Sequence, residues 1–235
     1  GNLASRLIQT RSPLYPVLEK ELAEWKHTQA ALLFNSGYAL NLGVLQALCT
    51  RETEVFSDSF NHASIIDGIR LSRAKKNPYR HCDMVDLRNR LSSSAALEKL
   101  IVTDSVFSVD GDRAPLADIC ELAQKFNCLL MVDEAHATGI FGKNQSGLVE
   151  ELGLNECVDI HMGTLSKAVA GLGGFFAGST LLRDFLINHA RSLIYSTALP
   201  HSVLAYDLAA IRYIRKTPGL GKKLIERAFK FRNHL

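Results

Sequence analysis

The sequence lacks the features that mark several classes of protein. It has no apolar run near the roughly 18 to 20 residues that a membrane-spanning helix needs, so we expect no membrane span. Its formal net charge is only +3, which is too small to indicate nucleic acid or an anionic membrane as a partner. It does not begin with a signal-peptide pattern.

The cysteines follow no recognisable pattern. The sequence has five cysteines, an odd number with no C-x-x-C pair: Cys49, Cys82, Cys120, Cys128 and Cys157. Most of them lie in apolar surroundings. This usage predicts reduced thiols in a cytoplasmic protein, with neither a disulfide framework nor a zinc or other metal site.

The sequence has a large apolar fraction, and strand-like apolar runs alternate regularly with helical patterns. Its 235 residues are 47% apolar, enough for one large domain with a core. Strand-like runs are predicted at 31–35, 54–58, 99–107, 128–134, 158–164 and 173–179, and helices at 18–26, 36–49, 62–74, 115–126, 181–195 and 202–216. The alternation predicts an α/β fold, with a mostly parallel central sheet and helices on both faces.

The strand-like run CLLMVDEAHATG, 128–139, ends in Asp133, Glu134 and His136. Two kinds of enzyme end a buried strand in this way: ATPases of the DEAH-box type, and enzymes that use pyridoxal phosphate (PLP). An ATPase needs a phosphate loop, G-x-x-x-x-G-K-[ST], before the acidic strand. The nearest stretches, GIFGKN at 139 and GLGKK at 219, lack its glycine spacing and its Ser or Thr, and both follow the acidic run. The absence favours the PLP hypothesis.

A PLP enzyme needs a lysine that forms a Schiff base and a carboxylate beside the pyridine nitrogen. Lys167 follows a predicted strand and is flanked by small apolar residues, a setting that desolvates the amine and favours its neutral form. The alternative is a surface lysine in a glycine-rich turn. Asp133 is the candidate carboxylate, and His136 could donate to the phenolic oxygen. Glu134 is interpreted as structural.

The phosphate and the ring need further groups. Ser36, Gly37 and Tyr38 stand at a predicted strand-to-helix junction, where free N–H groups attract an anion, although an ordinary helix cap has the same pattern. Thr164 could add a hydroxyl donor. His62 begins a predicted helix and could lie flat on a pyridine ring, although a lone histidine is more often a capping or solvated residue.

Six segments in order carry a family resemblance: FNSGYALN, DSFNHASIIDGIRLS, TDSVFSVDGDRAPL, MVDEAHATGIFG, GTLSKAVAGLGGFFAGS and IYSTALP. Together they resemble the α-oxoamine synthases, a family of PLP enzymes with the fold of aspartate aminotransferase (fold type I). Within that family, IYSTALP favours the branch that makes 8-amino-7-oxononanoate. The resemblance extends through essentially the whole chain.

The resemblance implies a role for each matching position. Lys167 would hold the cofactor and act with His62 in catalysis, and Asp133 would pair with the pyridine nitrogen. The remaining residues implied to bind the cofactor are Ser36, Gly37, Tyr38, Ser108, His136, Thr164, Ser196 and Thr197. The last two would approach the phosphate of a neighbouring subunit, because family members are homodimers with the active site at the interface.

The activity implied is the decarboxylating condensation of an amino acid, L-alanine, with an acyl-CoA, pimeloyl-CoA, in the cytoplasm. Two alternatives stay open: another α-oxoamine synthase such as 2-amino-3-ketobutyrate CoA ligase, and a non-catalytic partner subunit. Such subunits typically lose the lysine, which is present here.

The resemblance also implies a domain organisation. Residues 1–235 would form the large PLP-binding domain, with roughly 201–235 beginning the connection to a small domain, and we expect an amino-terminal segment and that small domain to be absent from this chain. Three positions depart from the family: Asp104 replaces a usual Glu and is expected to reach its partner less well, Tyr15 replaces a histidine and Cys82 replaces an asparagine.

Overall fold

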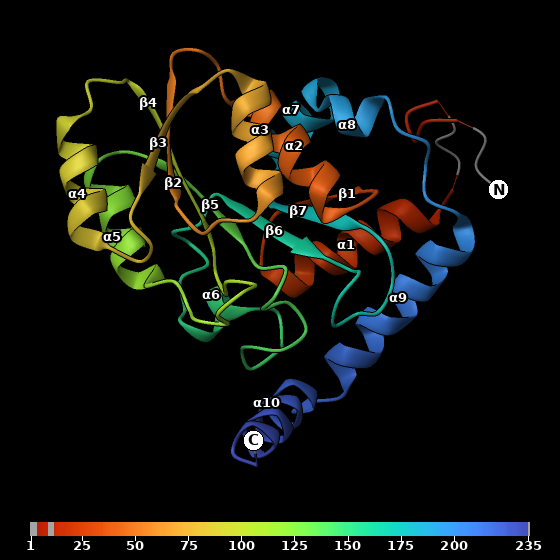
Figure 1. Cartoon of the computed structure of the whole chain (residues 1–235). Helices are drawn as coiled ribbons and strands as arrows, with labels where there is room; N and C mark the ends of the chain where they lie inside the picture. The colour runs from red at the N-terminus through yellow and green to blue at the C-terminus, as the bar shows by residue number, and fades with distance from the viewer. Residues whose placement is uncertain (1–3, 9–11, 235) are drawn as a thin grey trace.

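A seven-stranded sheet organises the computed structural model, which describes residues 4–8 and 12–234 (Figure 1). The strand order is β1-β7-β6-β5-β4-β2-β3. The strands are β1 (Ala30–Phe34), β2 (Thr53–Asp58), β3 (Lys75–Tyr79), β4 (Glu98–Asp104), β5 (Leu129–Asp133), β6 (Ile160–Thr164) and β7 (Gly174–Gly178). β7 runs antiparallel to β1 and β6, and the other neighbours are parallel. The predicted α/β fold with a mostly parallel sheet is confirmed.

Four helices cover one face of the sheet: α2 (Gly37–Leu48), α3 (Ala63–Ser72), α7 (Thr180–His189) and α8 (Arg191–Ile194) (Figure 1). Their apolar side chains share a core with alternate residues of β1, β2 and β4 to β7. α2 lies centrally in this layer because its apolar side chains meet both α3 and the sheet.

The opposite face carries two groups of helices. α4 (Met84–Ser93), α5 (Leu116–Lys125) and α6 (Leu148–Glu151) pack on the β4 and β5 side, and α1 (Leu14–Lys26) and α9 (His201–Lys216) pack on β1 and β7. α10 (Leu220–Arg232) follows α9 and leaves Leu224, Phe229 and Phe231 exposed. Helices therefore cover both faces, as the alternation predicts.

Two local features were not predicted. No element is predicted from the sequence at 75–93, where the structure has β3 and α4. β3 is a polar edge strand, KKNPY, of which only Tyr79 is buried, so it lacks the apolar pattern of the inner strands. The single helix predicted at 181–195 is wrong: the chain becomes extended at the buried Ala190, with ψ 98°, and α7 and α8 pack separately on the core.

The five cysteines are free thiols in this structure. Within the ranges that the structure describes, no helix combines the length and apolar character required to cross a membrane.

Candidate active site

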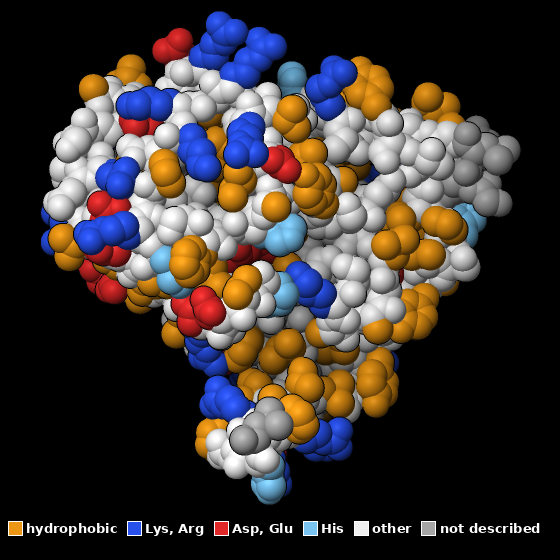
Figure 2. All heavy atoms as spheres, viewed as in Figure 1, with side chains coloured by type: hydrophobic (Ala, Val, Ile, Leu, Met, Phe, Trp, Pro, Cys, Tyr) orange, Lys and Arg blue, Asp and Glu red, His pale blue; other side chains and the backbone are white. Residues whose placement is uncertain are grey.

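The carboxyl ends of the central strands and the start of α2 and α3 enclose a cavity of about 240 Å³. On the face shown in Figure 2 it appears as a hollow where acidic, basic and histidine side chains gather. Nine predicted site residues line it: Ser36, Gly37, Tyr38, His62, Ser108, Asp133, His136, Thr164 and Lys167. Segments more than 100 residues apart in sequence therefore meet at this edge of the sheet.

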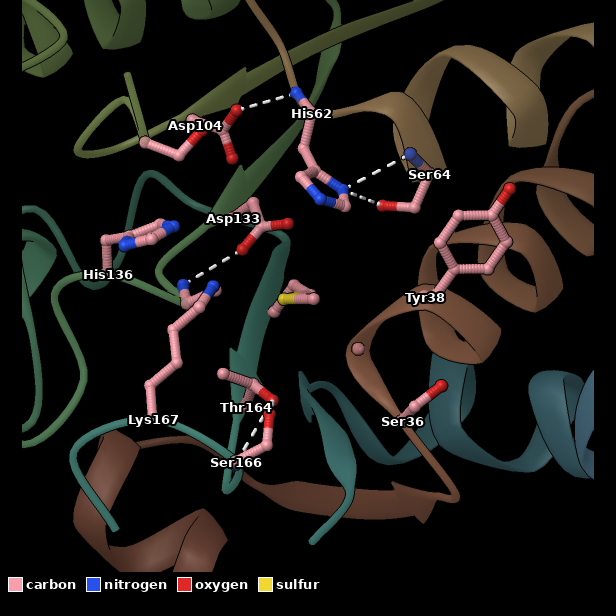
Figure 3. A pocket seen from close by; sticks show the side chains of 14 residues that line it. Ser36, Tyr38, His62, Ser64, Asp104, Asp133, His136, Thr164, Ser166 and Lys167 are labelled. Atoms are coloured by element: carbon pink, nitrogen blue, oxygen red, sulfur yellow. Dashed lines mark hydrogen bonds between the residues drawn. The ribbon is translucent and has the colours of Figure 1, made fainter. Parts of the chain in front are cut away.

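Lys167 and Asp133 extend into the same space (Figure 3). Lys167 follows β6, and partial burial lowers the pKa of its amine, although the carboxyls of Asp133 and Asp104 act against that change. Asp133 ends β5 and is almost wholly buried. Burial raises the pKa of the Asp133 carboxyl, and hydrogen bonds from Asn41 and from the Ala135 N–H oppose the increase. A cation beside this carboxyl would favour its ionised form.

The amino terminus of α2, at Ser36, Gly37 and Tyr38, is a candidate anion cradle. The Ser36 side chain caps the helix by accepting a hydrogen bond from the Ala39 N–H at 3.0 Å. The Gly37 and Tyr38 N–H groups belong to the first turn and have no acceptor within the helix. Both residues line the cavity, and Thr164 lies across from them at the end of β6. The predicted cap is confirmed, and its position also suits an anion.

The Tyr38 side chain is hydrogen-bonded to α3. Its hydroxyl donates a hydrogen bond to Asp67 on α3 at 2.5 Å, and Figure 3 shows that hydroxyl pointing away from Lys167. The bond to Asp67 raises the pKa of the Tyr38 hydroxyl, which holds the proton on the donor.

His62 is held at two points. It is the N-cap of α3, and its Nδ1 lies 2.7 Å from the Ser64 hydroxyl. Its backbone N–H donates to Asp104 at 2.9 Å, so the shorter acid still reaches this turn. Burial, and then the neighbouring Asp133, raise the pKa of Asp104 to about 8. His136 also lines the cavity, and burial lowers its pKa.

Comparisons with known proteins identify the family of the chain. The family model for aminotransferase class I and II matches residues 4–235. The chain belongs to this family. Within the family it is 48% identical over 235 residues to a putative 8-amino-7-oxononanoate synthase of Halalkalibacterium halodurans, covering all of this chain and 60% of that protein. It is 48% identical over 219 residues to 8-amino-7-oxononanoate synthase of Anaeromyxobacter sp., covering 93% of this chain and 55% of that protein.

Solved structures of family members share the fold. Serine palmitoyltransferase of S. paucimobilis, solved with a PLP–myriocin aldimine bound, superposes with a TM-score of 0.89 at 33% identity, covering 92% of this chain and 54% of that one. The 8-amino-7-oxononanoate synthase of Francisella tularensis gives a TM-score of 0.81 at 30% identity, covering 91% and 62%. The predicted resemblance to the α-oxoamine synthases is confirmed, and the chain spans about 60% of the length of the curated relatives it matches.

Two predicted residues lie elsewhere. Among the described residues, Ser196 and Thr197 are not part of the cavity lining. The Asn35 side chain donates to the Ser196 hydroxyl and to the Thr197 carbonyl, both at 2.6 Å. This places the pair beside the β1–α2 junction, with Thr197 exposed.

Several lining residues were missed by sequence reasoning. Ser64, Ser166 and Asp104 face the cavity, and Asn41 lies behind it on α2. Asn41 gave a usable signal, because it is a polar residue among the apolar positions that α2 buries. Ser166, two residues after Thr164, shares a hydrogen bond with its hydroxyl at 2.9 Å.

Glu134 has the structural role that the sequence analysis assigns to it. Its carboxylate forms a buried ion pair with Lys26 on α1 at 2.7 Å, and both side chains are 1% exposed. It also accepts a hydrogen bond from the Val149 N–H at 2.9 Å. Lys26 donates further to Thr138 and to the Ser146 carbonyl. These contacts fix the loop that follows Asp133.

Tyr15 and Cys82 are the other two departures from the family pattern. Tyr15 is buried, and its hydroxyl accepts a hydrogen bond from the Leu199 N–H at 2.8 Å. Cys82 adopts the left-handed conformation with φ 52°, which asparagine tolerates better than most residues, so the family's usual residue suits this backbone. Neither residue lines the cavity in the described structure.

Proposed function

We propose that the chain binds PLP and belongs to an acyltransferase that condenses L-alanine with a pimeloyl thioester, releasing carbon dioxide and giving 8-amino-7-oxononanoate. The observation that carries the proposal is the meeting of Lys167, Asp133 and His62 in one cavity beside the α2 amino terminus. The names of the most similar relatives support the reaction.

The donor set fits PLP. An amine suits its aldehyde, a buried carboxyl suits its pyridine nitrogen, and two first-turn N–H groups suit its phosphate. Gly174 supports the same interpretation, since a Cβ there would lie 2.6 Å from the Gly37 nitrogen and from the Ser36 carbonyl oxygen. The cradle is therefore built by close backbone approach, which only glycine permits at this position.

When bound, PLP supplies an electron sink for the α-carbon of the amino acid. Lys167 would hold PLP at its aldehyde, and its amine, whose pKa burial lowers, is suited to take the α-proton of the amino acid. Asp133 would hold the ring nitrogen in its protonated form, and His62 would orient the substrate. In the overall reaction a C–C bond forms at the thioester carbonyl, the thiol leaves, the carboxyl departs as carbon dioxide and the α-carbon regains a proton.

We also propose that the protein acts in the cytoplasm as a homodimer, in which Ser196 and Thr197 serve the partner's phosphate site. Their position outside their own chain's cavity supports this arrangement. Residues 1–235 would form the large domain, with 201–235 leading to a small domain, and the share of the relatives' length that the chain covers supports this division.

An absorbance titration tests the substrate. With PLP bound, adding L-alanine should shift the visible band, and glycine at the same concentration should not. A shift with glycine alone would favour a ligase of the 2-amino-3-ketobutyrate type instead. If no visible band appears with PLP, the cofactor assignment itself fails.

Gly174→Ala tests the cradle. The added methyl must displace the Ser36–Gly37 backbone, and overpacking of this kind costs about 1–3 kcal/mol. The PLP dissociation constant, measured by absorbance or fluorescence titration, should therefore rise about tenfold to a hundredfold. Gly153→Ala is a control for general destabilisation: alanine is strained at the positive φ of 69° there, but nothing lies within 4 Å of its Cβ and that turn is outside the cavity, so PLP affinity should be kept. Equal PLP affinity in wild type and Gly174→Ala would contradict the cradle.

A further inference from the structure

Asn41 is hydrogen-bonded to Asp133 directly and is linked to His62 through Ser64. After Lys167, these are the two residues on which the proposed function depends most. The Asn41 side chain is fully buried on α2. Its Nδ2 donates one hydrogen bond to Asp133 Oδ2 and another to the Ser64 hydroxyl, both at 2.9 Å. An amide nitrogen has two protons, so both are used. The amide orientation follows from Asp133 in its ionised form, which a cation in the cavity favours, because an ionised carboxylate can only accept.

The hydrogen bond from Asn41 to Ser64 determines which atom is the donor between Ser64 and His62. The Ser64 hydroxyl accepts from Asn41, so its own single proton is free to point at His62 Nδ1, 2.7 Å away. The Ser64 N–H also points at Nδ1, at 3.2 Å. Two donors converge on this nitrogen, so Nδ1 must be the acceptor and the ring proton must lie on Nε2. Figure 3 shows His62 and Ser64 in this arrangement.

One polar atom of the Asn41 side chain lacks a hydrogen-bond partner in the described structure. Its carbonyl Oδ1 is buried and has no hydrogen-bond partner among the described residues. A buried acceptor without a partner costs free energy, so an apolar residue would suit this position better if stability were its purpose. The two donated hydrogen bonds are therefore what the position provides.

We propose that Asn41 is a positioning residue that orients Asp133 with one amide proton and, through Ser64, fixes the tautomer of His62 with the other, so that Nε2–H faces the cavity as a hydrogen-bond donor. The relevance to catalysis rests on the proposed function, whereas the tautomer itself does not. Other groups near His62 are Asp104, which accepts its backbone N–H, and Asp133, Lys167 and His136, which line the same cavity.

The tautomer can be measured directly by long-range ¹H–¹⁵N correlation NMR of the histidine rings, in protein without and with PLP. His62→Gln identifies the His62 signals among those of the eight histidines. We expect the ring proton on Nε2 in the wild-type protein. In Asn41→Leu the Ser64 hydroxyl no longer has to accept from the amide, and only the Ser64 N–H still opposes a proton on Nδ1, so the population of the Nδ1–H form should rise above that of the wild type. Asn155→Leu, which removes an amide hydrogen bond to Lys26 away from the cavity, should leave the ring unchanged.

A second measurement, of PLP affinity, tests the hydrogen bond from Asn41 to Asp133. Loss of the hydrogen bond to Asp133 should raise the PLP dissociation constant of Asn41→Leu by about tenfold or more, since hydrogen bonds to charged groups are among the stronger ones. A proton on Nδ1 in the wild type would overturn the proposal, as would an unchanged ring tautomer in a folded Asn41→Leu. If the NMR result is as expected but the protein binds no PLP, the proposed function fails while the tautomer assignment stands.

Discussion

Replacing Lys167 with alanine should abolish turnover and remove the visible absorbance of the bound cofactor. The amine is the only proposed covalent contact to PLP and also the proposed base, and loss of a general base alone costs about 10² to 10⁴ in rate. With both roles removed, we expect a loss of at least about 10³-fold in kcat. PLP can still occupy the cavity, because the α2 cradle and Asp133 remain.

Lys167→Arg is the matched control for charge. It keeps a cation beside Asp133 and Asp104 but supplies no amine that can bond to the aldehyde. Both variants should therefore lose the visible band, and circular dichroism should show that both remain folded. Turnover within tenfold of the wild type in Lys167→Ala would contradict the assigned role.

Replacing Lys26 with methionine should destabilise the protein by about 3–5 kcal/mol, because it leaves the Glu134 carboxylate buried without its partner. The contacts of Lys26 with Thr138 and the Ser146 carbonyl are lost as well. Because Glu134 follows Asp133 directly, PLP affinity should fall together with stability. Urea-induced unfolding measures the first effect and a PLP titration the second.

The double variant Lys26→Met with Glu134→Gln separates the cost of the unpaired buried charge from the cost of losing the lysine side chain. A neutral amide at 134 keeps an oxygen that can accept from the Val149 N–H, but it removes the uncompensated charge. We therefore expect the double variant to be more stable than Lys26→Met alone. A single variant within about 1 kcal/mol of wild type would show that the buried pair contributes little.

Sequence reasoning identified the inner part of the fold because its signals are local. Strands such as β5 and β6 are continuous apolar runs, and Ser36 and His62 begin helices where the sequence places them. β3 was missed because an exposed edge strand buries little and so carries no apolar pattern. The break at Ala190 was missed because it depends on packing of α7 and α8 against the core rather than on a Pro or Gly signal.

The candidate site also has a part that local sequence signals predict and a part that they do not. Lys167, Asp133 and His62 could be found from ordered motifs, since each motif is contiguous in sequence. The hydrogen-bonded path from Asp133 through Asn41 and Ser64 could not, because it joins β5, α2 and α3 only after the sheet has formed. The contact between Glu134 and Lys26 spans 108 residues and likewise has no local signature.

Reduction with borohydride followed by peptide mass spectrometry tests the central claim most directly. Borohydride converts a C=N bond between PLP and a lysine into a stable amine, which marks the residue that holds the cofactor. The account predicts a pyridoxyl group on the peptide that contains Lys167, at close to one per chain, and its loss in Lys167→Ala. A label on a different lysine, or none in protein saturated with PLP, would contradict the account.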